Sequence, residues 1–474
     1  MTQTHDLTAT RMAAAVRTGE VSPVELTDHY LARIERLNEQ VGAYVTVTAE
    51  RAREEARQAE KAVLDADDRS ALPPLHGVPV PIKDLNLVNG VRMTFGSRVY
   101  SDLTGFADDH IVTRLREAGS VLLGKTTTPE FGLPCYTESD VAPPARTPWD
   151  LSRSAGGSSG GAAAAVAAGL APVAQGSDGG GSIRIPSSAC GLFGIKPTRG
   201  RVSQGPVVPD LFGLSTNGPI ARTVRDAALL LDVMAGHMPG DIYAAPPVEG
   251  SFASYAERPP GRLRIARSIE PPVPDAEVHP DCVAAYEAAS ELLEELGHEV
   301  VDLPPVLGPD VVPHFVTLWG AMATVTPVPE GSEHLLQPLT RWLRERGEAT
   351  SAPQLFQAHA ALQGALRAAF PVMNEYDAIL TPTLAQPPAP IGYFHDQEPA
   401  ENFERQKRFT PFTSMYNISG QPAVSVPLHV NADGLPIGIM LAGRLGGEGT
   451  LISLSAQLEE ARPWIDRKPE IWTA

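Results

Sequence analysis

Apolar residues along this chain follow two spacings, one helical and one typical of buried strands. The helical spacing extends over 7–37, and Ser22-Pro23-Val24-Glu25 within it predicts a helix start, because serine caps the first turn, proline fits it and glutamate favours the helix dipole. The short apolar runs 78–82 and 121–123 predict buried strands, with a helix over 111–118 between them. This alternation predicts an α/β protein.

Further segments continue the alternation to the C-terminus. The predicted helices are 45–65, 162–168, 222–234, 281–296 and 450–458, and the predicted strands are 262–267, 300–303, 378–382 and 423–427. Because no obvious break divides the chain, we expect a single domain over 1–474. Its expected regions are N-terminal helices over 1–70, a core over 71–235, a variable, loop-rich substrate region punctuated by prolines over 236–375, and a return to the core sheet over 376–474.

Two glycine-flanked serines are the most specific chemical feature of the sequence. Ser158 lies in Gly156-Gly157-Ser158-Ser159-Gly160-Gly161, and Ser182 follows 24 residues later in Asp178-Gly179-Gly180-Gly181-Ser182. Glycine lets the backbone turn so tightly that several N–H groups converge on one point, where the negative oxygen of an acyl-transfer intermediate can lie. Upstream, Lys83 ends an apolar run, and a buried lysine can lose its proton near neutral pH and act as a base.

The order and spacing of these motifs resemble the amidase signature family of serine hydrolases. The match includes both glycine and serine blocks, the alanine-rich segment between them and Gly194-Ile195-Lys196-Pro197-Thr198. It continues through 122–126 and 218–222 to 420–423, whereas 235–375 matches only loosely. The resemblance implies an α/β fold with a central mixed twisted sheet covered by helices on both faces.

The resemblance also implies a catalytic triad in which Ser182 is the nucleophile, Ser158 the relay and Lys83 the terminal base. The implied reaction is hydrolysis of the C–N bond of a neutral organic amide through an acyl-enzyme on Ser182. Esters, anilides and carbamates are further candidate substrates. In the family the peptide before the relay serine is cis.

Further residues are expected to assist the triad. The expected oxyanion donors are the backbone N–H groups of Gly179, Gly180, Gly181 and Ser182, and the expected supporting residues are Ser159, Asp178 and Arg184. Asp178 and Arg184 are expected to brace the glycine turn by pairing with it or with each other. Gly179 departs from the family, which usually carries a residue with a side chain there, and this glycine would loosen the oxyanion hole or widen the pocket.

Two segments with bulky uncharged side chains are expected to wall the cleft beside the nucleophile, as equivalent segments do in the family. The first supplies Phe131, Gly132, Cys135 and Tyr136, and the second, 315–322, supplies Trp319. A packed core is the competing interpretation of the second segment. Neither segment carries an arginine or a lysine, so we expect neutral amides to be preferred over substrates that bear a carboxylate.

Other patterns compete with this interpretation. The glycine block around Ser158 also fits G-x-S-x-G, the nucleophile elbow, which would make Ser158 the nucleophile; however, 147–154 is polar and turn-like where an elbow needs an apolar strand. The block could instead be a flexible linker, and Lys83 alone would be interpreted as a surface lysine. The P-loop pattern over 119–126 is disfavoured, because a helix precedes it and Pro129 breaks the place where a P-loop helix would begin.

Two other function classes remain open. A glutaminase-type A subunit of a glutamine-dependent aminoacyl-tRNA amidotransferase would use the same triad to release ammonia for its partner subunits. Strong glutaminase activity or co-purifying subunits would identify it. A catalytically silent binding protein is disfavoured, because all three residue types of the triad are present.

Composition limits the partners and the compartment. The chain has 38 basic and 56 acidic residues, a net charge of −18 that repels phosphate backbones, so no nucleic-acid partner is expected. Three cysteines without metal-type spacing, and scattered histidines, predict no metal and no cofactor, and they fit a reducing cytoplasm. Without a signal segment or a long apolar run, no membrane partner is expected. The expected partner is a small-molecule amide, and a homodimer is left open.

Overall fold

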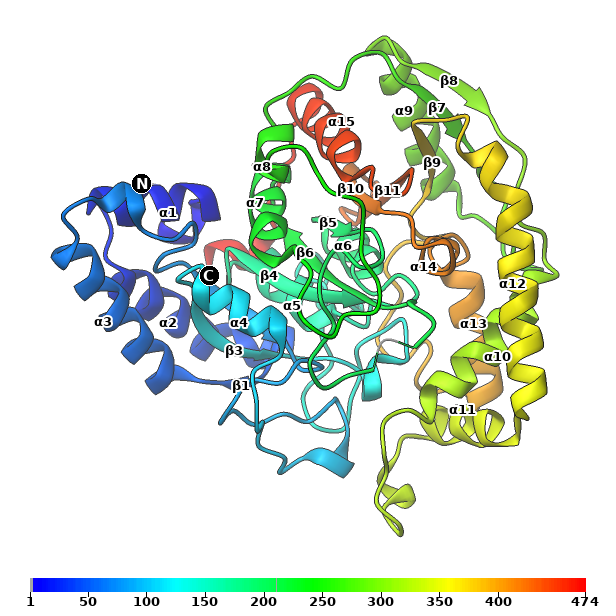
Figure 1. Ribbon diagram of the computed structural model, residues 1–474, viewed down its shortest axis with the longest axis horizontal. Helices are drawn as coiled ribbons and strands as arrows, with labels where there is room; N and C mark the ends of the chain where they lie inside the picture. Colours follow the sequence, from blue (N-terminus) through cyan, green and yellow to red (C-terminus); the bar gives the residue numbers. More distant parts are fainter. Residues whose placement is uncertain (1–2, 210) are drawn as a thin grey trace.

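A computed structural model describes residues 3–209 and 211–474 of the chain. Figure 1 shows the N-terminal helices, in blue, on one side of the molecule and the long helix α12 (Ala352–Met373), in yellow, along the opposite edge. Both termini lie on the side of the N-terminal helices, where Lys468 and Trp472 contact Asp6. The C-terminal end therefore packs against the start of the chain.

Three helices and one short strand form the N-terminal region. The helices are α1 (Ala9–Thr18), α2 (Pro23–Val41) and α3 (Ala49–Asp65). The predicted start of α2 is confirmed, because the Ser22 hydroxyl accepts the Glu25 N–H while the Glu25 carboxylate accepts the Ser22 N–H. The prediction of one helix over 45–65 is wrong at its beginning, where Val45 and its neighbours pair as a strand.

That strand belongs to a small sheet apart from the main one. The sheet contains β1 (Tyr44–Val47), β3 (Val121–Thr126) and β2 (Pro79–Lys83), in that spatial order. β1 is antiparallel to β3, and β2 is parallel to it. The strands predicted over 78–82 and 121–123 are therefore confirmed as strands, but they lie in a separate three-stranded sheet instead of the central one.

The central sheet has eight strands and is mixed, as predicted. Its spatial order is β4 (Val173–Asp178), β6 (Thr216–Ala221), β5 (Phe193–Lys196), β10 (Ala423–Val430), β11 (Pro436–Gly443), β9 (Ala378–Pro382), β7 (Arg264–Arg267) and β8 (Glu299–Asp302). Neighbouring strands from β4 to β9 are antiparallel, whereas β9, β7 and β8 are parallel to one another. The C-terminal strands thus join the core strands to the middle region.

The other helices pack on this sheet or on one another. They are α4 (His110–Glu117), α5 (Gly160–Ala167), α6 (Arg184–Cys190), α7 (Val224–Met234), α8 (Phe252–Tyr255), α9 (Pro280–Glu295), α13 (Pro399–Phe409), α14 (Met415–Ser419) and α15 (Glu448–Ala461). α6 and α15 pack on β10 and β11, and α9 packs on β9 and β11. The predicted α/β architecture is confirmed.

The middle region is more helical than the proline pattern predicts. Besides α12, it contains α10 (Val311–Ala323) and α11 (Pro338–Ala349), which pack on one another and frame one side of the molecule. The prediction of a loop-rich region is wrong over these helices, although the proline pairs behind it, such as 304–305, do lie outside helices. Other prolines occupy first turns of helices, where no backbone N–H is required. Pro338 begins α11, and Pro280 begins α9 in the same way.

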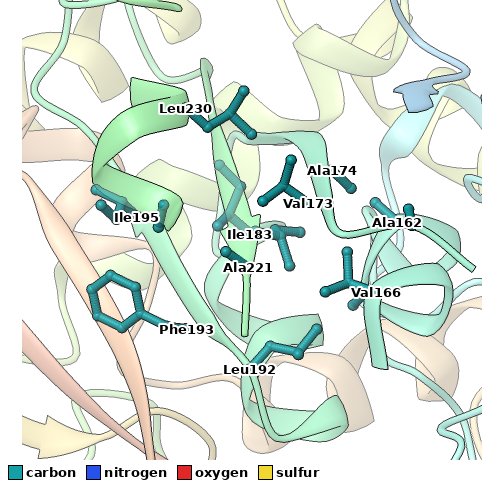
Figure 2. Close-up of a cluster of buried hydrophobic side chains, with 14 of the residues drawn as sticks. Ala162, Val166, Val173, Ala174, Ile183, Leu192, Phe193, Ile195, Ala221 and Leu230 are labelled. Carbon is teal, nitrogen blue, oxygen red and sulfur yellow. The ribbon is translucent and has the colours of Figure 1, made fainter. Parts of the chain in front are cut away.

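The short helix α5 is wholly buried and carries the first glycine and serine block at its beginning. Figure 2 shows Ala162 and Val166 of this helix among apolar side chains of β4, β5 and β6. Small side chains allow α5 to approach the backbone of its neighbours closely: a Cβ at Gly161 would lie 2.4 Å from the Thr127 nitrogen and 2.5 Å from the Ala43 oxygen. The same apolar cluster extends from Ala9 to Ile471.

We predict that Gly161→Ala destabilises the protein by about 3 kcal/mol or more, because backbone atoms on two sides would have to move to admit the methyl group. The matched change Gly364→Ala, in the interior of α12 where a Cβ meets nothing within 4 Å, should stabilise by about 0.5–1 kcal/mol through helix propensity. Chemical denaturation of both variants checks this. Equal effects at the two positions would contradict the packing argument.

Candidate active site

Lys83 lies at the end of β2 with a side chain that is 0% exposed. Its Nζ lies 2.8 Å from Ser158 Oγ, 2.9 Å from Ser159 Oγ and 3.0 Å from Ser177 Oγ. Ser177 reaches it because β4 runs close to β2, although the two strands belong to different sheets. The amine is therefore surrounded by hydroxyl groups and has no carboxylate partner within the described part of the chain.

Burial lowers the pKa of the Lys83 amine to about 7. The negative charge of Asp178 acts in the opposite direction, and a bidentate ion pair with Arg184 neutralises much of that charge. A lysine whose pKa lies near 7 is largely neutral in mildly alkaline solution, so its lone pair can accept a proton from a neighbouring hydroxyl. The Ser158 hydroxyl is the nearest of the three.

The loop that carries Ser158 is fixed from two sides. Its Gly157–Ser158 peptide is cis, as it is in the amidase signature family. Thr137 Oγ1 donates to the Gly156 carbonyl at 2.8 Å, and a Cβ at Gly157 would lie 2.7 Å from the Tyr136 nitrogen. The Ser159 N–H donates to the Ser182 carbonyl at 3.1 Å, which ties the two glycine and serine blocks together.

Asp178 and Arg184 form the expected pair, with both side chains fully buried. Arg184 Nε and Nη2 donate to the two carboxylate oxygens, each at 2.9 Å, and Asn417 Nδ2 donates to Oδ1 at 2.9 Å. Burial by itself would raise the pKa of Asp178, but the Arg184 guanidinium holds it well below its usual range. The carboxylate also accepts the N–H of Ile183, so it fixes the turn around Ser182.

This bracing engages one of the predicted oxyanion donors. The Gly181 N–H donates to Asp178 Oδ1 at 2.7 Å, and the carbonyl of the same peptide, that of Gly180, accepts Thr413 Oγ1 at 2.6 Å. Because the N–H and C=O of a trans peptide point in opposite directions, both contacts fix this peptide with its N–H toward Asp178. The N–H groups of Gly179, Gly180 and Ser182 have no protein acceptor in residues 3–209 and 211–474.

Two cavities meet at Ser182. The Ser158 cavity is lined by Ser158 and Ser182 together with residues that include Asn86, Phe131, Gly132, Gly179 and Asn217. The Lys407 cavity is lined by Lys407 and Ser182 together with residues that include Cys135, Gly180, Phe315, Phe403 and Met415. Ser182, Leu133 and Trp319 line both cavities, so Trp319 lies at their junction.

The structure places four of the five predicted cleft residues along these cavities, namely Phe131, Gly132, Cys135 and Trp319. Tyr136 is the exception. Its ring stacks on Phe394 at a centroid distance of 5.1 Å and its hydroxyl accepts Asn402 Nδ2, so it supports the loop from beneath and lines neither cavity.

The indole of Trp319 covers the glycine run from the cleft side. A Cβ at Gly179 would lie 3.6 Å from the ring, and a Cβ at Gly180 would lie 3.5 Å from it. A small side chain at either position would thus be in ordinary van der Waals contact with the ring.

Sequence analysis did not identify several residues of the site. Ser177 directly precedes Asp178, and this position next to the glycine block is a local signal that could have identified it. Asn417 reaches Asp178 from far along the chain, where only its asparagine type is visible. Lys407 corrects the prediction that the cleft lacks a lysine or an arginine, because it lies on a helix that sequence analysis did not place beside the cleft.

In the part of the chain that the structure describes, no group of three or more His, Cys, Asp or Glu side chains is placed to hold a metal ion. Nor does any described helix combine the length and the apolar character needed to cross a membrane.

A mixed α/β fold that places one glycine-flanked serine against a buried lysine, and a second one along the same cavity, is the arrangement of an amidase-type hydrolase. Comparison with known proteins identifies the family. The family model described as Amidase matches residues 25–452. The chain belongs to the amidase family and is a hydrolase that acts on amide C–N bonds.

Individual relatives agree over almost the whole chain. A putative amidase AmiB2 of Mycobacterium tuberculosis is 40% identical, with 98% of each chain covered. The 6-aminohexanoate-cyclic-dimer hydrolase of Paenarthrobacter ureafaciens is 36% identical, with 98% of this chain and 96% of the relative covered. A solved structure of 6-aminohexanoate cyclic dimer hydrolase with its substrate superposes with a TM-score of 0.92 at 32% identity, covering 99% of this chain and 100% of that one. These relatives give no support to the aminoacyl-tRNA amidotransferase alternative.

We predict that kcat/KM for an uncharged amide rises with pH through a pKa of about 7 and then levels off. Below that pKa the Lys83 amine is protonated and cannot accept a proton, whereas above it the neutral base is fully available. A pH–rate profile checks this, and in Lys83→Met any residual activity should lack the same titration. A profile that is flat across neutral pH in the unmodified enzyme would exclude Lys83 as the base.

Proposed function

We propose that the protein hydrolyses an uncharged organic amide by a Ser182 acyl-enzyme mechanism, with Ser158 as the proton relay and Lys83 as the base. The observation that carries this proposal is the buried Lys83 amine held among three hydroxyl groups, of which those of Ser158 and Ser177 belong to residues that share a cavity with Ser182. The family resemblance assigns the same three roles. Esters, anilides and carbamates present a similar acyl carbon and are further candidates.

The proposed reaction begins with proton movement toward Lys83. The neutral amine accepts the Ser158 proton, Ser158 accepts the Ser182 proton, and Ser182 Oγ forms a bond to the carbonyl carbon. No hydrogen bond joins the two serine hydroxyls in the described chain, so in this proposal that link closes when substrate binds.

The tetrahedral intermediate needs donors for its negative oxygen. We assign this role to the free N–H groups of Gly179, Gly180 and Ser182, since the Gly181 N–H is engaged by Asp178. One such donor contributes about 3–4 kcal/mol to lowering the barrier. The proton then returns through Ser158 to the leaving nitrogen, the C–N bond breaks, and water releases the acyl group from Ser182.

We also propose that the protein acts in a reducing cytoplasm. Cys135, Cys190 and Cys282 are all free and buried. Burial raises the pKa of the Cys135 and Cys190 thiols, and thiols held in the protonated form react slowly with oxidants. The three cysteines therefore fit a structural role in a compartment that keeps thiols reduced.

We predict that a fluorophosphonate labels Ser182, and that Ser182→Ala lowers turnover by at least about 10³-fold while the protein stays folded. Ser158→Ala should slow labelling, because the relay is lost, without moving the label to another residue. Peptide mapping by mass spectrometry identifies the labelled residue, and circular dichroism verifies the fold. A label on Ser158 would restore the nucleophile-elbow interpretation.

A further inference from the structure

The two cavities that meet at Ser182 differ in their relation to the proton relay. Ser158 lines the Ser158 cavity and not the Lys407 cavity. In the proposed mechanism Ser158 returns the proton to the leaving nitrogen, so that nitrogen must lie within hydrogen-bond reach of Ser158. The amine half of the substrate therefore extends into the Ser158 cavity, and the acyl half extends into the Lys407 cavity.

The Lys407 cavity is walled mainly by apolar side chains, among them Leu133, Val311, Phe315 and Met415. Lys407 is the one charged residue among the described residues that line either cavity. It lies on α13, on the stretch of that helix that also places Phe403 at the cavity wall. A charged group beside an apolar wall interacts more strongly with a polar group than it would in water.

The Lys407 ammonium keeps donors that the protein does not use. Lysine has three N–H donors, and the described contacts of this group are one ion pair, with Glu404 Oε1 at 2.7 Å, and the ring of Phe403 at 6.0 Å. The Glu404 side chain is 46% exposed, against 22% for that of Lys407. An ion pair with a carboxylate exposed to that extent is weak, and it does not prevent the ammonium from donating to a ligand.

We propose that Lys407 is a specificity residue that donates a hydrogen bond to an acceptor oxygen on the acyl half of the substrate. This inference rests on the proposed function, because it uses the relay to orient the amide. The substrate class is an amide whose acyl chain carries a second carbonyl, ester or carboxylate oxygen beyond the reacting carbon. A purely aliphatic acyl chain of the same length binds the apolar wall but leaves Lys407 without this contact.

The test compares 4-nitroanilides that share one leaving group. The acyl groups are hexanoyl, with no distal acceptor, adipoyl monomethyl ester, with a neutral acceptor, and adipoyl, with a carboxylate. Lys407→Met should lower kcat/KM about tenfold for at least one acceptor-bearing substrate, the size expected for a charge-assisted hydrogen bond, and change the hexanoyl value less than twofold. The ester and the acid then show whether a neutral oxygen or a carboxylate is recognised.

Two further variants separate a contact from a general change of charge. Glu404→Gln removes the negative charge that competes for the Lys407 ammonium and should raise the preference for the acceptor-bearing acyl groups. Arg408→Met removes a positive charge from the next position of α13, which lines neither cavity, and should leave the preference unchanged. An equal loss with all three acyl groups, or the same loss in Arg408→Met, would overturn the proposal.

A second substrate series tests the orientation. Of the hexanoyl amides of aniline and of 4-acetylaniline, only the second carries an acceptor oxygen on the amine half, and Lys407→Met should leave the ratio of their kcat/KM values unchanged. A loss confined to the 4-acetylanilide would place the amine half beside Lys407 and overturn the proposal. If the unmodified enzyme hydrolyses none of these amides, the proposed function fails; if it hydrolyses them without dependence on Lys407, only this inference fails.

Discussion

The site depends on keeping one lysine amine out of water without giving it a carboxylate. Burying an ammonium is costly, so a lysine in such a place gives up its proton near neutral pH and becomes a base. Lys83 meets this condition because Ser158, Ser159 and Ser177 satisfy its nitrogen with hydroxyl groups. A carboxylate at the same distance would stabilise the protonated form and remove the base.

The need to enclose the Lys83 amine explains why three segments that are far apart in the sequence lie together. Lys83 ends β2, Ser159 precedes α5, and Ser177 lies in β4, so the amine is enclosed only when both sheets and the buried helix are in place. Asp178, the carboxylate whose charge raises the pKa of Lys83, is committed to Arg184 and to backbone N–H groups around Ser182. The same pairing that limits the influence of Asp178 on Lys83 also fixes the turn that carries Ser182.

The candidate catalytic residues could be singled out from the sequence because the geometry around them makes local demands on it. Tight turns need glycine at the positions next to Ser158 and Ser182, and this demand is visible in a few consecutive residues. The features that could not be predicted depend on distant contacts. The direction of the Gly181 N–H is set in part by Thr413, and the place of Lys407 beside the cleft depends on how α13 packs.

The errors in the predicted helices and strands also come from contacts between distant parts of the chain or from the starts of helices. The four residues of β1 pair with β3, which lies far along the chain. In the sequence β1 directly precedes the charged, alanine-rich helix α3, so the helical pattern of α3 was extended over it. Prolines in the middle region resemble helix breakers along the sequence, but Pro338 and others begin helices. Helices and strands were therefore predicted well where the pattern of apolar residues is long. They were predicted poorly where pairing with a distant strand, or a proline at a helix start, determines the element.

Different parts of the chain supply the candidate catalytic groups and the wall of the Lys407 cavity. The groups around Lys83 come from the first half of the chain, whereas much of the wall of the Lys407 cavity comes from α10, α13 and α14 in the second half. The two parts meet at Trp319, whose ring lies against Gly179 and Gly180. Side chains on α10 and α13 can thus change the shape and charge of the Lys407 cavity without touching the hydrogen bonds of Lys83, and so substrate selectivity can vary on this fold while the chemistry stays constant.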